Sequence, residues 1–316
     1  MKKIMLSALA FMMLFSCQND TTETSSPETT ASLKRGCASQ EVLDAQMKAD
    51  PTLALRMNKI EEFTKKAMTN GRLVNGKIEI PVVVNVLYRT AAENISLAQI
   101  QSQIDVLNAD FNATNSDFSS TPALFSGVAA NVGISFVLET VNRKSTTKTS
   151  WGTRDAMKKT KQGGLDPTSP TTKLNMWACT IGGGILGYAQ FPGGASATDG
   201  VVMDTKYFGL SGSGAYPYNL GRTATHEVGH WMNLRHIWGD ATCGSDLVSD
   251  TPTHNDANYG VPAYPHYSTC TGTPVEMTMN YMDYTDDRGM YMFSNGQKSR
   301  MAAIFVAGGA RASFGI

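Results

Sequence analysis

The chain has 316 residues, of which 41% are hydrophobic, and its 27 Lys and Arg balance 27 Asp and Glu. A chain of this length can bury a sizeable core in one large domain or two smaller ones. The zero net charge and the lack of a basic cluster in the sequence exclude the usual signature of a nucleic-acid-binding protein.

The first 16 residues are predicted to be a targeting segment. Lys2 and Lys3 precede an apolar run over 4–15, which is too short to span a bilayer permanently. The run ends at Ser16-Cys17, and a small residue before cysteine is typical of a bacterial lipoprotein cleavage site. We therefore expect an exported protein anchored at the cell envelope by a lipid on Cys17; secretion after cleavage nearby is the alternative.

Three successive parts are expected after this segment: a tether over 17–32, a pro-segment over 33–72 and a catalytic domain over 73–316. The tether is rich in Thr, Ser and Glu and cannot bury a core. The pro-segment has helical periodicity over 41–68. Its candidate processing sites are Lys65, Lys66 and Arg72.

Strands and helices alternate in the next part of the chain, which predicts a mixed α/β sheet. Short apolar runs predict strands over 80–88, 132–138, 174–178 and 201–203. A capping box at Ser96–Gln99 opens a helix. Its apolar stripe gives the expected core positions Leu97, Ile100, Ile104, Leu107 and Phe111.

The glycine-rich segment over 182–194 is predicted to be a sheet-edge strand with an irregular loop. A nucleotide site is rejected, because no Gly-Lys-Ser/Thr follows the glycines. A surface loop without a special role is the alternative.

The strongest chemical signal is His226-Glu227-Val228-Gly229-His230, followed by His236. On a helix, His226 and His230 lie one turn apart on the same face, where two imidazoles can bind one zinc ion. Glu227 then lies beside the metal and can take a proton from a zinc-activated water. His236 reaches the same metal only if the helix ends sharply, and Asn233 tolerates the positive φ that such a turn requires.

This motif resembles the signature of the metzincin zinc peptidases, with Asn233 in place of their glycine. The run Asn280–Tyr284 is similar to their methionine turn. Together with Trp231–Asp240, Val248–Pro252 and Met282–Asp287, it resembles the pappalysin family and its ulilysin-like bacterial members. The resemblance extends from about Ile78 to about Phe305. It implies a metzincin-like α/β (α+β) fold, with a twisted mixed sheet and an active-site helix up to about residue 236. A mostly irregular subdomain over 237–316 would follow, with a methionine turn and a closing helix.

The resemblance also assigns roles to particular residues. Met282 is expected to form an apolar floor under the histidines, and the hydroxyl of Tyr284 either to stabilise the oxyanion or to be satisfied in the core. Cys243 and Cys270 are expected to form a disulfide. An edge strand that pairs with an extended peptide substrate would use the main chain of Gly187, Tyr188, Ala189 and Gln190.

Two further sites have open alternatives. In several metzincins a pro-segment cysteine binds the zinc, so Cys37 is predicted to keep the enzyme latent; a disulfide with Cys179 or a free thiol is the alternative. Cys179 itself is expected to be a buried free thiol. Asp246, Asp250 and Thr251 form an oxygen-rich loop that suits structural calcium, with solvated loop acids as the alternative.

The predicted function is a zinc endopeptidase that is made as a latent zymogen and acts as a monomer on peptides or proteins. Asp286 or Asp287 would favour Arg or Lys after the cut. A second capping box, Ser294–Gln297, opens the closing helix over 296–306, which buries Met301 and Ile304. A zinc amidase for a non-protein substrate and a catalytically silent surface binding protein are the alternatives.

Overall fold

The computed structural model describes residues 34–69, 78–211 and 215–314. The expected targeting segment, Cys17, the tether and the processing site Arg72 lie outside these ranges. Within the described ranges, no helix has both the length and the apolar character needed to cross a bilayer.

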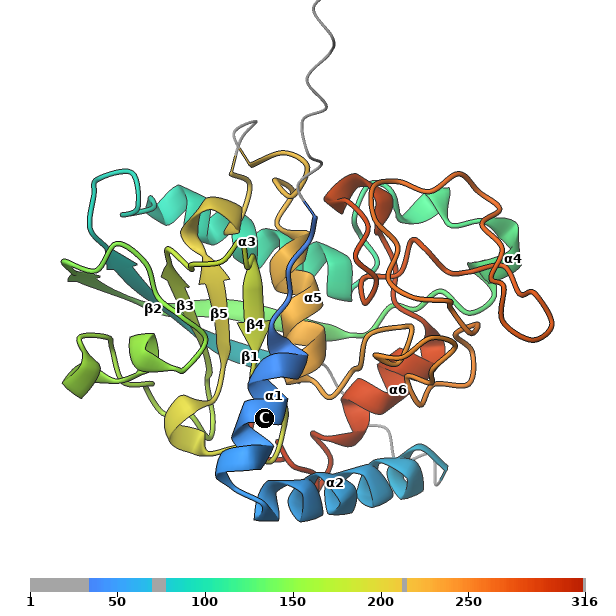
Figure 1. Cartoon of the computed structure of the whole chain (residues 1–316), viewed down its shortest axis with the longest axis horizontal. Helices are drawn as coiled ribbons and strands as arrows, with labels where there is room; N and C mark the ends of the chain where they lie inside the picture. The colour runs from blue at the N-terminus through green and yellow to red at the C-terminus, as the bar shows by residue number, and fades with distance from the viewer. Residues whose placement is uncertain (1–33, 70–77, 212–214, 315–316) are drawn as a thin grey trace, which may run out of the picture. The chain divides into compact units, whose positions relative to one another are not determined.

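A five-stranded mixed sheet forms the centre of the fold (Figure 1). Its strands, in the spatial order β2-β1-β3-β5-β4, are β1 (Ile78–Tyr88), β2 (Ile134–Ser145), β3 (Leu174–Cys179), β4 (Gly187–Ala189) and β5 (Val201–Asp204). Neighbouring strands pair in parallel, except that β4 runs antiparallel to β5 at one edge. The predicted mixed sheet and the edge strand in the glycine-rich segment are confirmed.

Strand β2 continues to Ser145, well beyond the end predicted at residue 138. Its second half contains Asn142, Arg143 and Lys144, so no apolar pattern marks it as a strand. Pairing with β1, which extends to the Tyr88–Ser145 register, keeps this edge strand extended.

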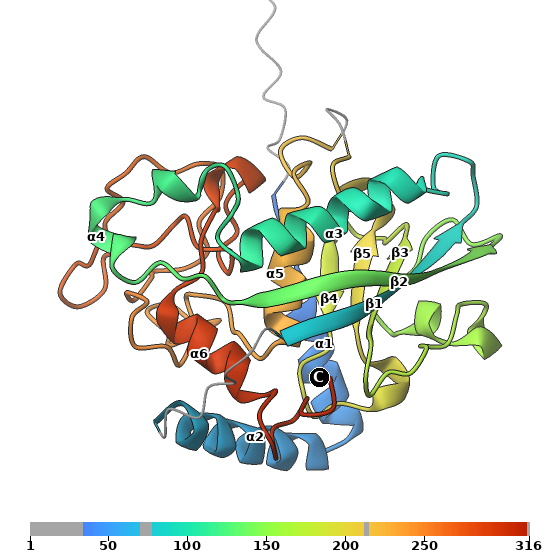
Figure 2. The same ribbon diagram turned by 180° about the vertical axis from the view of Figure 1, so that it is seen from behind.

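Helices α3 (Leu97–Phe111) and α5 (Arg222–Trp231) contact each other and the sheet (Figure 2), and the short α4 (Ala123–Ser126) follows α3. Ser96 caps α3 by accepting a hydrogen bond from the Gln99 backbone N–H, as predicted. The other apolar positions of the stripe are buried, but Leu97 is 59% exposed, so its core assignment is wrong. At 100° per residue Leu97 lies about 50° from the centre of the stripe, in the first turn.

The chain between α5 and α6 (Asn295–Ala303) is described throughout and contains no α-helix. Cys243 and Cys270 form a disulfide within it, as the resemblance implies. The capping box of Ser294 and Gln297 is present at the start of α6. Helix α6 ends before the predicted end at residue 306, and Met301 and Ile304 are buried.

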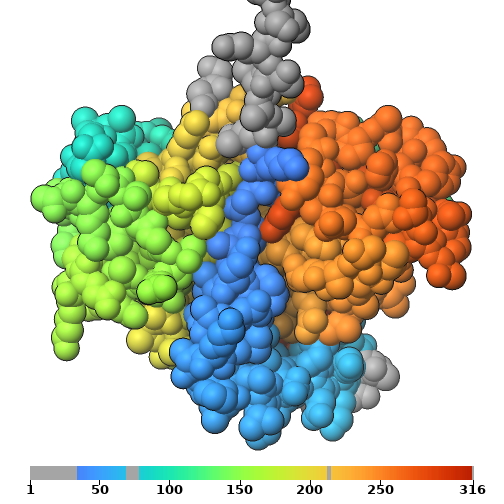
Figure 3. Space-filling view, in the orientation of Figure 1, coloured from blue at the N-terminus to red at the C-terminus, as the bar shows by residue number. Residues whose placement is uncertain are grey.

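The expected pro-segment forms two helices, α1 (Ser39–Ala49) and α2 (Thr52–Thr69), in place of the single helix predicted over 41–68. Asp50 breaks it with an extended backbone (φ −133°, ψ 91°), which a residue before proline favours. Helix α1 contacts β4, and α2 contacts α6. In Figure 3 this blue segment lies between the green and yellow surface of the sheet part and the orange surface of the C-terminal part.

Candidate metal centre

Helix α5 holds His226, Glu227 and His230 in the interior of the protein. Ala224 and Val228 bury the apolar face of the helix in the main core, and Thr225 donates a 2.7 Å hydrogen bond to Asp110 of α3. This packing fixes the rotation of α5 about its axis. The Nε2 atoms of His226 and His230 consequently lie 3.1 Å apart, as the one-turn spacing predicts.

A sharp turn at Asn233 brings the third imidazole to the other two. Asn233 has φ +73°, the left-handed conformation expected for it, and its carbonyl accepts a 2.7 Å hydrogen bond from the buried Arg300. Leu234 returns to the core. The Nε2 of His236 then lies 3.1 Å from that of His230.

The three imidazoles fit a bound cation. Each Nδ1 faces an oxygen: His226 the Tyr281 carbonyl at 2.7 Å, His230 the Leu234 carbonyl at 2.9 Å, and His236 an Asp240 carboxylate oxygen at 2.5 Å. With the ring protons on Nδ1, three Nε2 lone pairs converge without a proton between them, an arrangement that a shared metal ion satisfies.

Burial favours the neutral ligand form of His226 and His230. It lowers the pKa of His230 to about 3, and neighbouring His236 adds to the effect. Burial also lowers the pKa of His226 well below its usual range, with the two other imidazoles contributing.

Glu227 lies next to the three rings and is fully buried. Its Oε2 accepts hydrogen bonds from the Ser39 hydroxyl at 2.8 Å and from the Cys37 thiol at 3.4 Å, whereas Oε1 has no hydrogen-bond partner among the described residues. Burial raises the pKa of Glu227 to about 7, against the opposing effect of these two donors. A carboxyl group with such a pKa can both accept and donate a proton near neutral pH.

Cys37 belongs to the same cluster. Its sulfur and one nitrogen from each of the three imidazoles all lie within 4.8 Å of one another. Cys37 and Cys179 are both free thiols, so the alternative disulfide between them does not form. Cys179 is a buried free thiol, as predicted.

Met282 approaches α5 at a glycine. It is fully buried, and its backbone N–H donates to the Asn280 side chain within a tight turn. A Cβ atom on Gly229 would lie 2.5 Å from the Met282 sulfur, closer than real atoms pack. Gly229 therefore leaves room for the methionine against the helix that carries two of the imidazoles.

Tyr284 lies against two of the three imidazoles. Its ring centroid is 5.6 Å from that of His226 and 4.9 Å from that of His236. Its hydroxyl donates a 3.3 Å hydrogen bond to the carbonyl of Cys37. Burial raises the pKa of Tyr284, so the hydroxyl keeps its proton and can donate.

The edge strand β4 pairs with the segment that leads to α1. Gly36 O accepts from Leu186 N at 2.8 Å, Ala38 N donates to Gly187 O at 3.1 Å, and the Ser39 hydroxyl accepts from Ala189 N at 2.8 Å. The Cys37–Gly187 bridge is parallel. The other two residues predicted to hold a peptide form hydrogen bonds elsewhere within the protein. The buried Tyr188 donates a hydrogen bond from its hydroxyl to Asp155, and Gln190 N donates to Gly200 O.

Arg35 is buried beside the cluster in a polar site, here called the Asp287 pocket. Its guanidinium donates to Asp287 Oδ1 at 2.6 Å, to the Thr223 hydroxyl at 3.1 Å and to the Thr285 carbonyl at 3.3 Å. Both members of the Arg35–Asp287 pair are buried. Asp286 also lies near Arg35, but burial raises its pKa and no hydrogen bond joins the two side chains among the described contacts.

The oxygen-rich loop forms hydrogen bonds within the protein. Asp246 accepts from the Thr251 hydroxyl, and Asp250 accepts from the Ser294 hydroxyl at 2.6 Å and from Gly296 N at 2.8 Å, next to the start of α6. Calcium binding at Asp246, Asp250 and Thr251 stays a prediction.

Sequence reasoning did not single out several residues of the site. Asp240 orients His236, Trp238 stacks on the His236 ring at 4.3 Å, and Ser39 contacts Glu227. Asp240 is predictable from its spacing, because an acid four residues after a ligand histidine can accept the proton of its other ring nitrogen. Ser39 has no such signal, since 188 residues separate it from Glu227.

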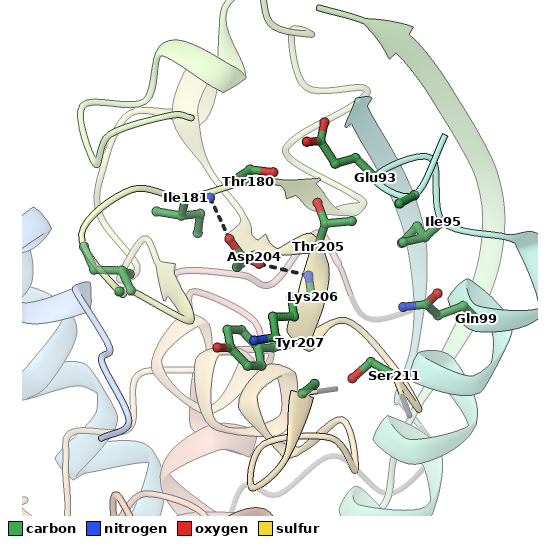
Figure 4. Close-up of a pocket in the computed structure, with 14 residues that line it drawn as sticks. Glu93, Ile95, Gln99, Thr180, Ile181, Asp204, Thr205, Lys206, Tyr207 and Ser211 are labelled. Carbon is green, nitrogen blue, oxygen red and sulfur yellow. Dashed lines mark hydrogen bonds between the residues drawn. The ribbon is translucent and has the colours of Figure 1, made fainter. Parts of the chain in front are cut away.

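A separate pocket of about 570 Å³ opens beyond the carboxyl ends of β3 and β5 (Figure 4). Asp204 lies at its wall and accepts hydrogen bonds from Ile181 N at 2.7 Å and Lys206 N at 2.9 Å. None of the three histidines lines this pocket, so it is distinct from the metal centre.

Known proteins resemble the chain over most of its length. The family profile Peptidase_M43, described as Pregnancy-associated plasma protein-A, matches residues 177–306. An extracellular metalloprotease of Pyricularia oryzae is 31% identical over 307 residues, covering 95% of this chain and 92% of the relative. One from Verticillium alfalfae is 34% identical and covers 71% of this chain and 77% of the relative.

Two solved structures also resemble the chain. A variant of Tannerella forsythia promirolysin has a TM-score of 0.82 and 40% identity, covering 89% of this chain and 97% of that one. Mature mirolysin in complex with a cleaved peptide has a TM-score of 0.74 and 44% identity, covering 77% and 97%. The chain therefore belongs to the Peptidase_M43 family, the pappalysin metalloproteases.

Proposed function

We propose that this metalloprotease is an exported zinc endopeptidase, made as a latent zymogen. The observation that carries the proposal is the convergence of three imidazoles beside a buried carboxylate, with a cysteine of the preceding segment at the same point. His226, His230 and His236 would hold the zinc in the active form. Export is supported by the extracellular relatives, and the lipid on Cys17 remains part of the proposal.

Zinc, when bound, would supply a Lewis acid that polarises the peptide carbonyl and makes water a nucleophile near neutral pH. Glu227 accepts the proton from the attacking water and later donates it to the leaving nitrogen. Tyr284, with its protonated hydroxyl beside His226 and His236, donates a hydrogen bond to the oxygen that gains charge. In the latent form this hydroxyl is occupied by the Cys37 carbonyl.

Latency would rest on the segment 34–39. Cys37 would be a further ligand to the zinc beside the three imidazoles, and Ser39 donates a hydrogen bond to the oxygen of Glu227 that would accept the proton. The same segment uses the outward Gly187 carbonyl and Ala189 N–H of β4, so an extended substrate cannot pair there. Removal of the segment would free the zinc site, the Glu227 carboxylate and the edge of β4 together.

Selectivity for arginine after the cut follows from the pocket that holds Arg35. Asp287 offers Oδ1 to the guanidinium, while its Oδ2 is fixed by the backbone N–H groups of Leu220 at 2.8 Å and Arg222 at 3.3 Å. A fixed, buried carboxylate selects a planar cation that can form several hydrogen bonds. We propose that a substrate arginine takes the place of Arg35.

The test is cleavage of casein and of a quenched peptide containing one arginine by the activated enzyme. Cleavage that stops with a chelator, returns with zinc and is lost in Glu227→Ala supports the proposal. An enzyme that hydrolyses only non-protein amides would be an amidase. If Glu227→Ala retained the full biological effect of the chain, the silent binding protein would replace the proposal.

A further inference from the structure

Lys34 lies over an aromatic ring, one residue before the arginine that fills the Asp287 pocket. Its Nζ is 4.9 Å from the centroid of the Tyr259 ring. This distance is within the range of a cation–π contact. Tyr259 is 41% exposed in the presence of Lys34, and it packs against Tyr284 at 5.9 Å between ring centroids. The ring thus lies next to Tyr284, which in turn contacts two of the three imidazoles.

Three side chains of the segment 34–37 contact, in turn, the imidazoles, the Asp287 pocket and the Tyr259 ring. Cys37 lies at the three imidazoles, Arg35 is buried on Asp287, and Lys34 lies on Tyr259. Neighbouring side chains of an extended chain point to opposite sides, so a pocket and a ring on different walls are contacted by adjacent residues. A substrate that is cut at the imidazoles and places its next residue on Asp287 would run opposite to this segment, and the residue after its arginine would then face the Tyr259 ring.

We propose that Tyr259 is a specificity-determining residue, which binds a second basic side chain next to the arginine of the substrate. The inference rests on the proposed function, because it takes the Asp287 pocket as the site for the residue after the cut. The substrate class is then a peptide with two consecutive basic residues, Arg followed by Lys or Arg, immediately after the scissile bond.

Two carboxyl groups lie near the ring. Asp256 and Asp283 add to the effect of burial in raising the pKa of Tyr259. Asp286 lies near both Arg35 and Arg288. Arg288 is a competing positive charge, but it lies over the Tyr216 ring, 5.8 Å from that centroid.

The expected effect is modest, because the ring is partly exposed. A cation–π contact at such a site favours the cation by about two- to fivefold in kcat/KM. The readout must therefore be a ratio within one enzyme, in which losses common to both substrates cancel. Two quenched peptides serve, identical except that lysine or its uncharged isostere norleucine follows the single arginine.

We expect the activated wild-type enzyme to cleave the lysine peptide two to five times more efficiently. Tyr259→Leu should bring the ratio to about one, while Tyr259→Phe, which keeps the ring, should preserve it. Tyr267→Leu is the matched control, since Tyr267 is 60% exposed and has no ring contact with the segment 34–37. It should leave the ratio at the wild-type value.

A ratio of one in the wild-type enzyme would overturn the inference, as would a preference that persists in Tyr259→Leu. In either case, chelator-sensitive cleavage of both peptides would leave the proposed endopeptidase function intact. Absence of cleavage of any arginine peptide would instead contradict the proposed function. Thermal melting of each variant separates loss of folding from loss of selectivity.

Discussion

The Ser39 hydroxyl donates a 2.8 Å hydrogen bond to Oε2 of Glu227, across 188 residues of sequence. The segment 34–39 therefore does more than place a thiol at the imidazoles: its Ser39 also contacts the carboxylate that would take the proton from water. The proposed latency would then have two separable contributions, one from Cys37 and one from Ser39.

Substituting these residues should make the intact chain active before processing. A hydrogen bond to a charged group is worth about 1.5–3 kcal/mol, so we expect Ser39→Ala to raise the activity of the uncut chain by about tenfold or more. Cys37→Ala should raise it further, because the coordination position becomes free. Initial rates on a quenched peptide, with gels to verify that the chain is uncut, provide the measurement. Rates equal to wild type in both variants would exclude this form of latency.

Asp287 and Asp286 should differ in their effect on selectivity. Asp287→Asn removes the charge that faces Arg35, and we expect kcat/KM for an arginine peptide to fall by about 10- to 100-fold, the value of a charge-assisted hydrogen bond. A norleucine peptide should lose far less. Asp286→Asn is the matched control and should change the preference little. Equal losses of kcat/KM in the two variants would mean that the charge of Asp287 does not select the arginine side chain.

The turn at Asn233 should accept glycine but not a bulky residue. With φ at +73°, Asn233→Gly is expected to keep the melting temperature and the bound zinc. Asn233→Val should cost about 1–2 kcal/mol or more, because Cβ-branched side chains clash in the left-handed region. Denaturant unfolding and metal analysis measure both. Wild-type stability in the valine variant would show that the turn can relax.

Asp110 should make stability depend on pH. Burial raises its pKa from 3.8 to about 6, against the opposing charge of Arg222. Since the folded pKa is raised, its contribution to stability is present below about pH 4 and is lost as pH rises through about 6. The stability of Asp110→Asn relative to wild type should therefore increase by about 2.5 kcal/mol between pH 4 and pH 7.5. Urea unfolding at both values measures this, with the exposed Asp105→Asn as control.

The local part of the site could be predicted from the sequence because its chemistry is local. His226, Glu227 and His230 share one helix, and Asn233 brings His236 back within six residues. The prediction of Met282 and of the disulfide depended on the family resemblance, because no rule of residue spacing predicts their positions.

Contacts between distant segments could not be predicted in the same way. Arg35 and Asp287 are 252 residues apart, and neither carries a pattern that names its partner. The same limit explains the errors in the fold. The polar half of β2 is held by pairing with β1, and Leu97 is exposed because burial depends on what covers the first turn of α3.

The missing side chain at Gly229 has a consequence for engineering. A methyl group there would collide with the Met282 thioether at 2.5 Å, and Met282 lies in the turn that also carries Tyr281 and Tyr284. Alanine at 229 would therefore displace both the Tyr281 carbonyl, which faces Nδ1 of His226, and the Tyr284 ring, which lies against His226 and His236. A mutational library of this enzyme should therefore keep glycine at position 229.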